Sequence, residues 1–450
     1  MAISEVARPV WTSDDGTMAQ DTARTRWHRI IENILDSIRS SLIENALNFQ
    51  ERTEVLSSQQ RAEAADIQCQ LRALHQEIVS DKKLSPIDLH GDPDEHWFNQ
   101  HLGASSQLSW QAAPWLFAEC YLYRRVQALF AGSTFWRGYD VFKGQKDSTF
   151  TRSPAAVQDL AARYVTNVEE RQQPDDGDLL KFKEFSDMMQ VALWGNATDL
   201  SLLNRPTLED LQALQKQSSA AMVVDDDLDQ LWSHLNSSAY QASSRNVDIV
   251  LDNAGFELFT DLLLAMYLLD QGIARRVTLH TKAFPWFVSD ATLSDIDTLM
   301  TVLRSKDFFA EREALDPLCD RLAALFSEGK ISTTQHWFWT TGSAFPEMPS
   351  RAMDLFRDLV GRDLVIFKGD LNYRKLTSDG LWPHTTPFKT ALGPLGAGSG
   401  MKILALRTNK ADVCVGLDSE DQIRRLDEIC PKGGWLRNGK YGVISFSDGK

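Results

Sequence analysis

The sequence predicts a three-layer α/β/α sandwich, built on a mainly parallel, doubly wound sheet, together with an N-terminal all-helical domain. The first half of the chain repeats apolar residues at spacings of three and four and carries almost no strand signal. The second half alternates short β-branched runs with helical patterns, which is the order that parallel sheets require. We therefore expect a helical domain over residues 1–235 and an α/β/α domain over residues 236–450.

The helical half is predicted from its apolar periodicity, which turn-rich breaks interrupt. Its end is marked by the segment 222–244, which contains several aspartates and two serine pairs. Such a composition is typical of a solvated acidic linker. The helices expected before it span residues 27–39, 51–79, 112–130, 154–165 and 179–193.

The second half is predicted to alternate from residue 246 onwards, because each apolar run is short enough for a strand and most are followed by a helical pattern. The expected strands are 247–251, 276–281, 363–367, 402–406, 413–416 and 441–446. The expected helices are 256–269, 293–303, 315–326 and 349–359.

Composition excludes several classes of protein. The 62 acidic residues exceed the 47 basic ones, and the net charge of −15 argues against nucleic acid as a partner. No apolar run approaches the roughly 20 residues of a membrane helix, and the N-terminus lacks the apolar core of a secretory signal, so we expect a cytoplasmic protein without a membrane partner. The five scattered cysteines lack CxxC spacing, which favours reduced thiols.

The most informative residues are Asp252 and Asn253, at the end of the first predicted strand of the second half. Ligands of open α/β sheets bind beyond the carboxyl ends of the strands. An acid and an amide offer hard oxygen ligands, which suit Mg²⁺ or Mn²⁺. The helix that follows Gly255 suits a phosphate at its start. A turn or a helix cap would also explain the pair taken alone.

Other strand ends strengthen the hypothesis of a metal and phosphate site. In one parallel sheet they would deliver Lys282 and then Asp290, the run 368–374, and the run 407–410 to the same edge. They would add a third metal ligand and a group of cations that could hold phosphate oxygens. The sequence contains no GxxxxGK[ST] loop, GxSxG elbow or HExxH motif, and the glycine-rich run 392–400 is expected to be a flexible loop, with a lid as one role.

Six segments together match the motifs of one known family. They are Arg26–Ile31, Leu193–Leu202, Leu251–Glu257, Phe287–Asp290, Phe367–Lys375 and Arg407–Lys410. With these segments the chain resembles the damage-control phosphatase family, in particular the branch also described as acidic-residue methyltransferases. The similarity extends over most of the chain, and the motifs GDLNYR and RTxK are specific as a pair.

The resemblance implies the functional residues. Asp252, Asn253 and Asp290 would be the metal ligands and the catalytic residues, and they would also touch the substrate. Asn196 and Glu257 are further candidates. The divalent metal would be Mn, Co, Ni or Mg. The remaining substrate-binding residues implied are Asp370, Leu371, Asn372, Tyr373, Arg374 and Lys410.

The implied activity is hydrolysis of small phosphomonoesters, notably fructose 1-phosphate or fructose 6-phosphate, in metabolite repair. Asp252 could attack phosphorus and form an aspartyl phosphate, or a water activated by the cation could attack; the second route is favoured because Asp252 already serves as a ligand. An S-adenosylmethionine-dependent protein-glutamate O-methyltransferase is the alternative enzyme, and a non-catalytic interaction protein is the third class. The partner expected is a small phosphorylated metabolite, and a monomer is slightly favoured.

Overall fold

The computed structural model describes residues 7–47, 57–105, 107–151, 153–170, 178–195 and 222–450. Within these ranges no helix is long and apolar enough to cross a membrane. Residues 173–177, one of the turn-rich breaks of the helical half, and the first residues of the helix expected at 51–79 lie outside the described residues.

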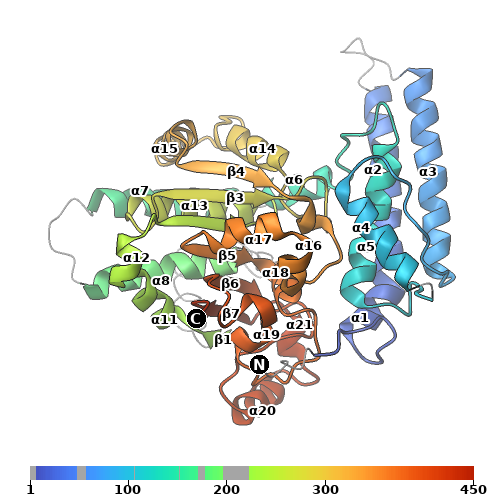
Figure 1. The fold of residues 1–450 in the computed structure, drawn as a ribbon. Coiled ribbons are helices and arrows are strands. Elements are labelled where there is room, and N and C mark those ends of the chain that lie inside the picture. Colours follow the sequence, from blue (N-terminus) through green and yellow to red (C-terminus); the bar gives the residue numbers. More distant parts are fainter. Residues whose placement is uncertain (1–6, 48–56, 106, 152, 171–177, 196–221) are drawn as a thin grey trace.

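One sheet of seven strands organises the described part of the second half (Figure 1). Its order is β1-β7-β6-β5-β2-β3-β4, and every neighbouring pair is parallel except β6 and β7. Strand β2 lies between β3 and β5, with Val247 opposite Val277 and Leu364. The strands are β1 (Val223–Asp226), β2 (Asn246–Val250), β3 (Arg276–Thr281), β4 (Ile331–Gln335), β5 (Leu364–Lys368), β6 (Ile403–Thr408) and β7 (Gly442–Ser447).

Helices cover both faces of the sheet, which confirms the predicted three-layer α/β/α fold. Successive strand residues point to opposite faces, so Ile249 joins one apolar core and Val250 the other. The first layer comprises α6 (Lys143–Thr151), α7 (Pro154–Glu170), α8 (Asp178–Trp194), α11 (Leu228–Leu235), α12 (Ser238–Ala242), α13 (Phe256–Asp270), α14 (Leu293–Leu303) and α15 (Leu315–Ser327). The second comprises the 3₁₀ helices η4 (Trp337–Thr340), η5 (Phe345–Glu347) and η6 (Gly393–Leu395), with α16 (Met348–Arg351), α17 (Met353–Val360), α18 (Gly369–Leu376), α19 (Phe388–Ala391), α20 (Glu420–Ile429) and α21 (Gly434–Arg437).

A helical bundle stands beside the sheet, in blue and cyan at the right of Figure 1. Its aromatic core takes in Trp286 and Leu371 from the α/β body, so the two parts share packed side chains. The N-terminal segment also joins them, because Val10 donates to the carbonyl of Asp379 (2.9 Å) and accepts from the amide of Trp115 (2.8 Å). The bundle consists of α1 (Met18–Asp21), the π-helical turn η1 (Thr22–Arg26), α2 (Trp27–Leu47), α3 (Ser58–Val79), α4 (Pro93–Ala104) and α5 (Trp115–Ala131).

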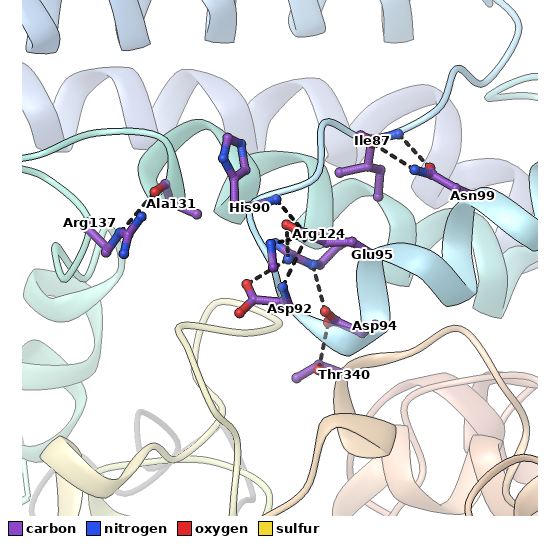
Figure 2. A network of polar contacts seen from close by, with 11 residues as sticks. Ile87, His90, Asp92, Asp94, Glu95, Asn99, Arg124, Ala131, Arg137 and Thr340 are labelled. Carbon is purple, nitrogen blue, oxygen red and sulfur yellow. Dashed lines mark hydrogen bonds and ion pairs between the residues drawn. The ribbon is translucent and has the colours of Figure 1, made fainter.

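A buried ion network at the start of α4 ties this bundle to the α/β body (Figure 2). The Arg124 guanidinium on α5 donates to Asp92 (2.8 Å), Asp94 (3.1 Å) and Glu95 (2.7 Å). Asp94 also accepts a hydrogen bond of 3.0 Å from the hydroxyl of Thr340, at the end of η4. Burial raises the pKa of Asp94 although the nearby guanidinium works to lower it. The charges are therefore paired within the bundle, and the hydroxyl of Thr340 connects them to the α/β body.

The segment 222–244 differs from the solvated linker that its composition favours. Residues Val223–Asp226 form β1, the edge strand beside β7, and Asp225 accepts a hydrogen bond from the hydroxyl of Ser445. Helices α7 and α8 pack in the same core as the strands. Helices that precede residue 235 therefore share one apolar core with the strands that follow it. The domain boundary at 235/236 stays a prediction.

Three further segments differ from the expected local structure. Residues 413–416 form a loop, in which the amide of Gly416 donates to the carbonyl of Thr386 (2.8 Å). The residues after β5, where no helix is among those expected, form helix α18. In the glycine-rich run, Leu395 is fully buried and the amides of Gly398 and Gly400 donate to the carbonyl of Gly449, so this run is packed on the C-terminal segment.

Candidate functional site

Two loops at the carboxyl edge of the sheet meet at Asp252 and Asn253. The loop after β2 carries this pair, and the turn between β3 and α14 carries Asp290. Asn253 forms an isolated antiparallel bridge with Asp290, and the amide of Ala291 donates to the carbonyl of Asp252 (2.7 Å). The structure thus brings together the three residues predicted as metal ligands.

The amide group of Asn253 is held on both sides. Its Nδ2 donates to Oδ2 of Asp252 (2.8 Å) and to Oε2 of Glu257 (2.8 Å), in the first turn of α13. Its Oδ1 accepts a hydrogen bond from the hydroxyl of Ser289. Glu257 therefore belongs to the site as well as to the helix start.

Three acids, Asp252, Glu257 and Asp290, place concentrated negative charge in a buried position. The pKa of Asp252 is raised well above its ordinary value, first by burial and then by the charges of Glu257 and Asp290, while Lys410 and Lys282 work to lower it. Burial also raises the pKa of Asp290. A cation bound between these groups would neutralise the charge, so the residues fit a divalent metal with oxygen ligands.

Lys282 balances one of these acids. Its Nζ lies 3.0 Å from Oδ2 of Asp290, with both side chains 2% exposed, and it donates to the carbonyl of Leu251 (3.1 Å). Because Lys282 follows β3 directly, the ion pair fixes Asp290 relative to two strand ends. The sequence predicts Lys282 at this edge of the sheet, and the structure has it there.

Lys368 forms ion pairs with two buried carboxylates of α13. Its Nζ lies 2.8 Å from Asp261 and 3.2 Å from Glu257, and it donates to the carbonyl of Ala192 on α8 (2.6 Å). Burial works to lower the pKa of Lys368, but the two carboxylates outweigh it and raise the pKa. Lys368 thus fixes the carboxylate of Glu257 through their ion pair.

Gly369 lets helix α18 begin against Asp252. Its φ is +83°, and a Cβ on this residue would lie 1.9 Å from Oδ2 of Asp252. Only glycine combines this backbone conformation with such a close approach. The start of α18 therefore lies directly against the carboxylate of Asp252.

Two residues in the first turns of α18 connect the neighbouring strand ends. Asp370 Oδ1 accepts from Nε of Arg407 (2.8 Å) and from the backbone amide of Lys410 (3.0 Å). Asn372 Nδ2 donates to the carbonyls of Lys368 (2.7 Å) and Leu251 (3.3 Å). Both side chains thus organise the edge of the sheet on which Asp252 lies.

Leu371 and Tyr373 of α18 face protein groups away from this edge. Leu371 packs in the core of the bundle. The hydroxyl of Tyr373 accepts from the amide of Val415 (3.1 Å). The helical turn rotates these side chains away from the side on which Asn372 lies.

Arg374 is engaged by two buried carboxylates. It donates to Asp379 (2.9 and 3.1 Å) and to Glu119 on α5 (2.8 Å), and its guanidinium lies 3.6 Å from the centre of the Trp115 ring. The structure does not show this guanidinium directed at Asp252. The substrate-binding roles of Leu371, Tyr373 and Arg374 stay predictions.

Some residues of this region carry no clear signal in the sequence. Glu119 lies in the helical half of the sequence, more than a hundred residues before the first predicted strand. For Asp261 there is a weak signal: it lies four residues after Glu257 on the predicted helix, and this spacing places both side chains on the same face. Lys375 donates to the carbonyl of Thr341 (2.7 Å), and burial lowers the pKa of Lys375 to about 8. Asn196 lies outside the described residues.

The candidate metal centre combines two carboxylates with one amide. In the ranges that the structure describes, no three His, Cys, Asp or Glu side chains are arranged as a metal site. Asn253 presents its nitrogen to Asp252, so a metal there would require its amide to turn and present oxygen.

Comparison with known proteins identifies the class. Residues 22–426 match the family described as the damage-control phosphatase ARMT1-like domain. The chain belongs to this family, and it is a phosphatase of metabolite damage control.

Individual relatives match along nearly the whole chain. The damage-control phosphatase ARMT1 of Danio rerio is 33% identical, with 96% of this chain and 95% of the relative covered. That of Xenopus tropicalis is 34% identical (96% and 97%), and that of Homo sapiens 31% (96% and 97%). A solved DUF89 family protein from Pyrococcus horikoshii is 16% identical, with a TM-score of 0.40 over 79% of this chain and 89% of that one.

Proposed function

We propose that this phosphatase depends on a divalent metal and hydrolyses small phosphomonoesters, with sugar phosphates such as fructose 1-phosphate or fructose 6-phosphate as the substrate class. The observation that carries the proposal is the meeting of the buried Asp252 and Asp290 with the partly buried Asn253 at the carboxyl edge of the sheet. The name of the relatives, damage-control phosphatase, supports the same reaction. Action in the cytoplasm, as a monomer, is part of the proposal.

Asp252, Asn253 and Asp290 would hold Mn²⁺, Co²⁺, Ni²⁺ or Mg²⁺. When bound, such a cation neutralises phosphate oxygens and favours attack on phosphorus. Lys282 keeps Asp290 in place through their 3.0 Å ion pair, whereas the amide of Asn253, whose nitrogen donates to Glu257 (2.8 Å), would turn to present its oxygen to the cation. The ion pair with Lys282 would thus preorganise Asp290 before substrate arrives.

Two groups would act on the phosphate. Lys410 follows β6, and its charge acts on the Asp252 carboxyl, so its ammonium is placed to attract a phosphate oxygen. Asp252, at the carboxyl end of β2, would either position an attacking water or attack phosphorus itself. In both routes Lys410 lowers the cost of bringing a dianion to an acidic site.

A panel of sugar phosphates tests the proposal. Phosphate release is measured after treatment with a chelator and after addition of each metal, for the unaltered protein and for Asp252→Ala and Asp290→Asn. We expect activity to disappear in chelator, to return with metal, and to be lost in both variants while cooperative unfolding is kept. Activity that persists in chelator would refute the metal dependence.

The same preparations test the alternative enzyme. Transfer of a labelled methyl group from S-adenosylmethionine to protein carboxylates, without release of phosphate from any sugar phosphate, would contradict the proposal.

Lys410→Ala should mainly raise KM for the phosphorylated substrate, and unchanged kinetics would remove Lys410 from the site.

A further inference from the structure

The turn that carries Asp290 has an unfavourable backbone conformation. Phe287 and Val288, directly before Ser289 and Asp290, have φ values of +46° and +71°. Residues other than glycine are uncommon in this region, and a β-branched residue there is an outlier. Such strain persists only where the surroundings impose it. Something must therefore hold the turn in the conformation that places Asp290.

Helix α5 of the bundle supplies the contacts. The Tyr123 ring stacks on Phe287, with centroids 4.6 Å apart and planes 27° apart, and it lies 5.8 Å from the ring of Trp286. The guanidinium of Arg124 lies over Phe284, 5.2 Å from the ring centre. Tyr123 is only 1% exposed, so its ring is confined against the turn.

The backbone transmits this packing to Asp290. The amide of Asp290 donates a 3.0 Å hydrogen bond to the carbonyl of Trp286. The Trp286 side chain is fully buried in the core of the bundle. A residue anchored in the bundle is thus bonded directly to the backbone of a candidate metal ligand.

We propose that Tyr123 is a positioning residue of the phosphatase, whose ring fixes the strained turn at 286–288 and so holds Asp290 beside Asp252 and Asn253. The inference rests on the proposed function, because it takes Asp290 as a metal ligand. A residue of the helical bundle would then position a ligand of the metal centre.

The ring, rather than the hydroxyl, performs this role. The Tyr123 hydroxyl is buried and has no hydrogen-bond partner among the residues that the structure describes. Phenylalanine would keep the stack on Phe287 and remove a polar group that is costly to bury unpaired. Tyr123→Phe should therefore retain metal affinity and activity.

The test is the affinity for Mn²⁺ alone, measured by calorimetry on the full chain without substrate. Tyr123→Leu should weaken it about 10-fold or more, the usual effect of removing a group that orients a metal ligand, and Tyr123→Phe should not. Phe98→Leu, which removes another fully buried aromatic ring of the bundle, is the matched control and should leave the affinity unchanged. Wild-type affinity in a folded Tyr123→Leu, or equal losses in Tyr123→Phe and Tyr123→Leu, would overturn the inference.

Two further variants separate positioning from loss of folding. Phe287→Leu removes the same stack from the half-buried side, and it should reproduce the loss of affinity if Tyr123→Leu does not fold. Val288→Gly should partly restore affinity to the Tyr123→Leu or Phe287→Leu variant, because glycine adopts a φ of +71° without strain. Failure of this rescue would contradict positioning through the turn. Wild-type Mn²⁺ affinity in Asp290→Asn would instead refute the proposed metal ligand.

Discussion

Arg374 on α18 and Glu119 on α5 form a buried hydrogen bond of 2.8 Å between Nη1 and Oε2. Asp379 occupies the other side of the guanidinium. Arg374 therefore joins the bundle to the helix that begins against Asp252. A residue that was predicted to clamp phosphate thus has a clear structural role as well.

Glu119→Leu should lower the free energy of unfolding by about 3 kcal/mol, because it leaves a buried guanidinium with one carboxylate instead of two. Urea unfolding measures the change. Asp320→Ala, which removes the partner of Arg304 in an exposed ion pair, is the control and should cost less than about 1 kcal/mol. Unchanged stability with a raised KM would show that Arg374 serves the substrate and not the junction.

Gly369→Ala should abolish most of the activity and destabilise the fold. The new Cβ would lie 1.9 Å from Oδ2 of Asp252, so the carboxylate or the start of α18 must move. The control is Gly398→Ala, at a similar φ of +81° but with no atom within 4 Å of the added Cβ. It should lose only the roughly 1 kcal/mol that a positive φ costs alanine. Equal effects on kcat in the two variants would argue against the contact with Asp252.

The central part of the site could be predicted because parallel strands share one carboxyl edge. This rule places Asp252, Asn253 and Lys282 from the ends of two apolar runs. It reaches Asp290 less directly, since the turn before that residue is fixed by packing on Tyr123. Such packing depends on contacts across 160 residues or so of chain, and periodicity carries no information about it.

The segments that sequence analysis missed are those whose structure depends on distant partners. Residues Val223–Asp226 contain two aspartates and form a strand only because β7 pairs with them, from Val223 to Gly442. Helix α18 spans eight residues and starts at a glycine, so its pattern resembles that of a turn. Since the helix turns Tyr373 and Arg374 toward other elements, a prediction that does not include this helix cannot give their contacts.

Lys368→Met should lower the free energy of unfolding by about 3 kcal/mol near neutral pH, because Asp261 and Glu257 lose their buried partner. Burial already raises the pKa of Asp261 to about 7, well above its unfolded value near 4. Without Lys368 that pKa rises further, and the acid is neutral in the folded state at low pH. The loss should therefore be smaller at pH 5 than at pH 8 in urea titrations. Lys330→Met, in an exposed pair with Glu328, is the control.

Asp225 should make the stability of the wild-type protein fall as pH rises. Burial raises the pKa of Asp225 to about 8, and the charges of Asp227 and Asp226 add to the shift, whereas the unfolded chain titrates near 4. Between these values the folded state binds more protons than the unfolded state, so stability is greatest below pH 4 with respect to this group and is lost up to pH 8. Asp225→Asn should remove the dependence and stabilise the protein by at least about 1 kcal/mol at pH 8 relative to pH 5, the equivalent of one pKa unit. Thermal or urea unfolding at both pH values measures this, with the exposed Asp229→Asn as control. A pH dependence that is the same in both variants would show that Asp225 is ionised in the folded protein.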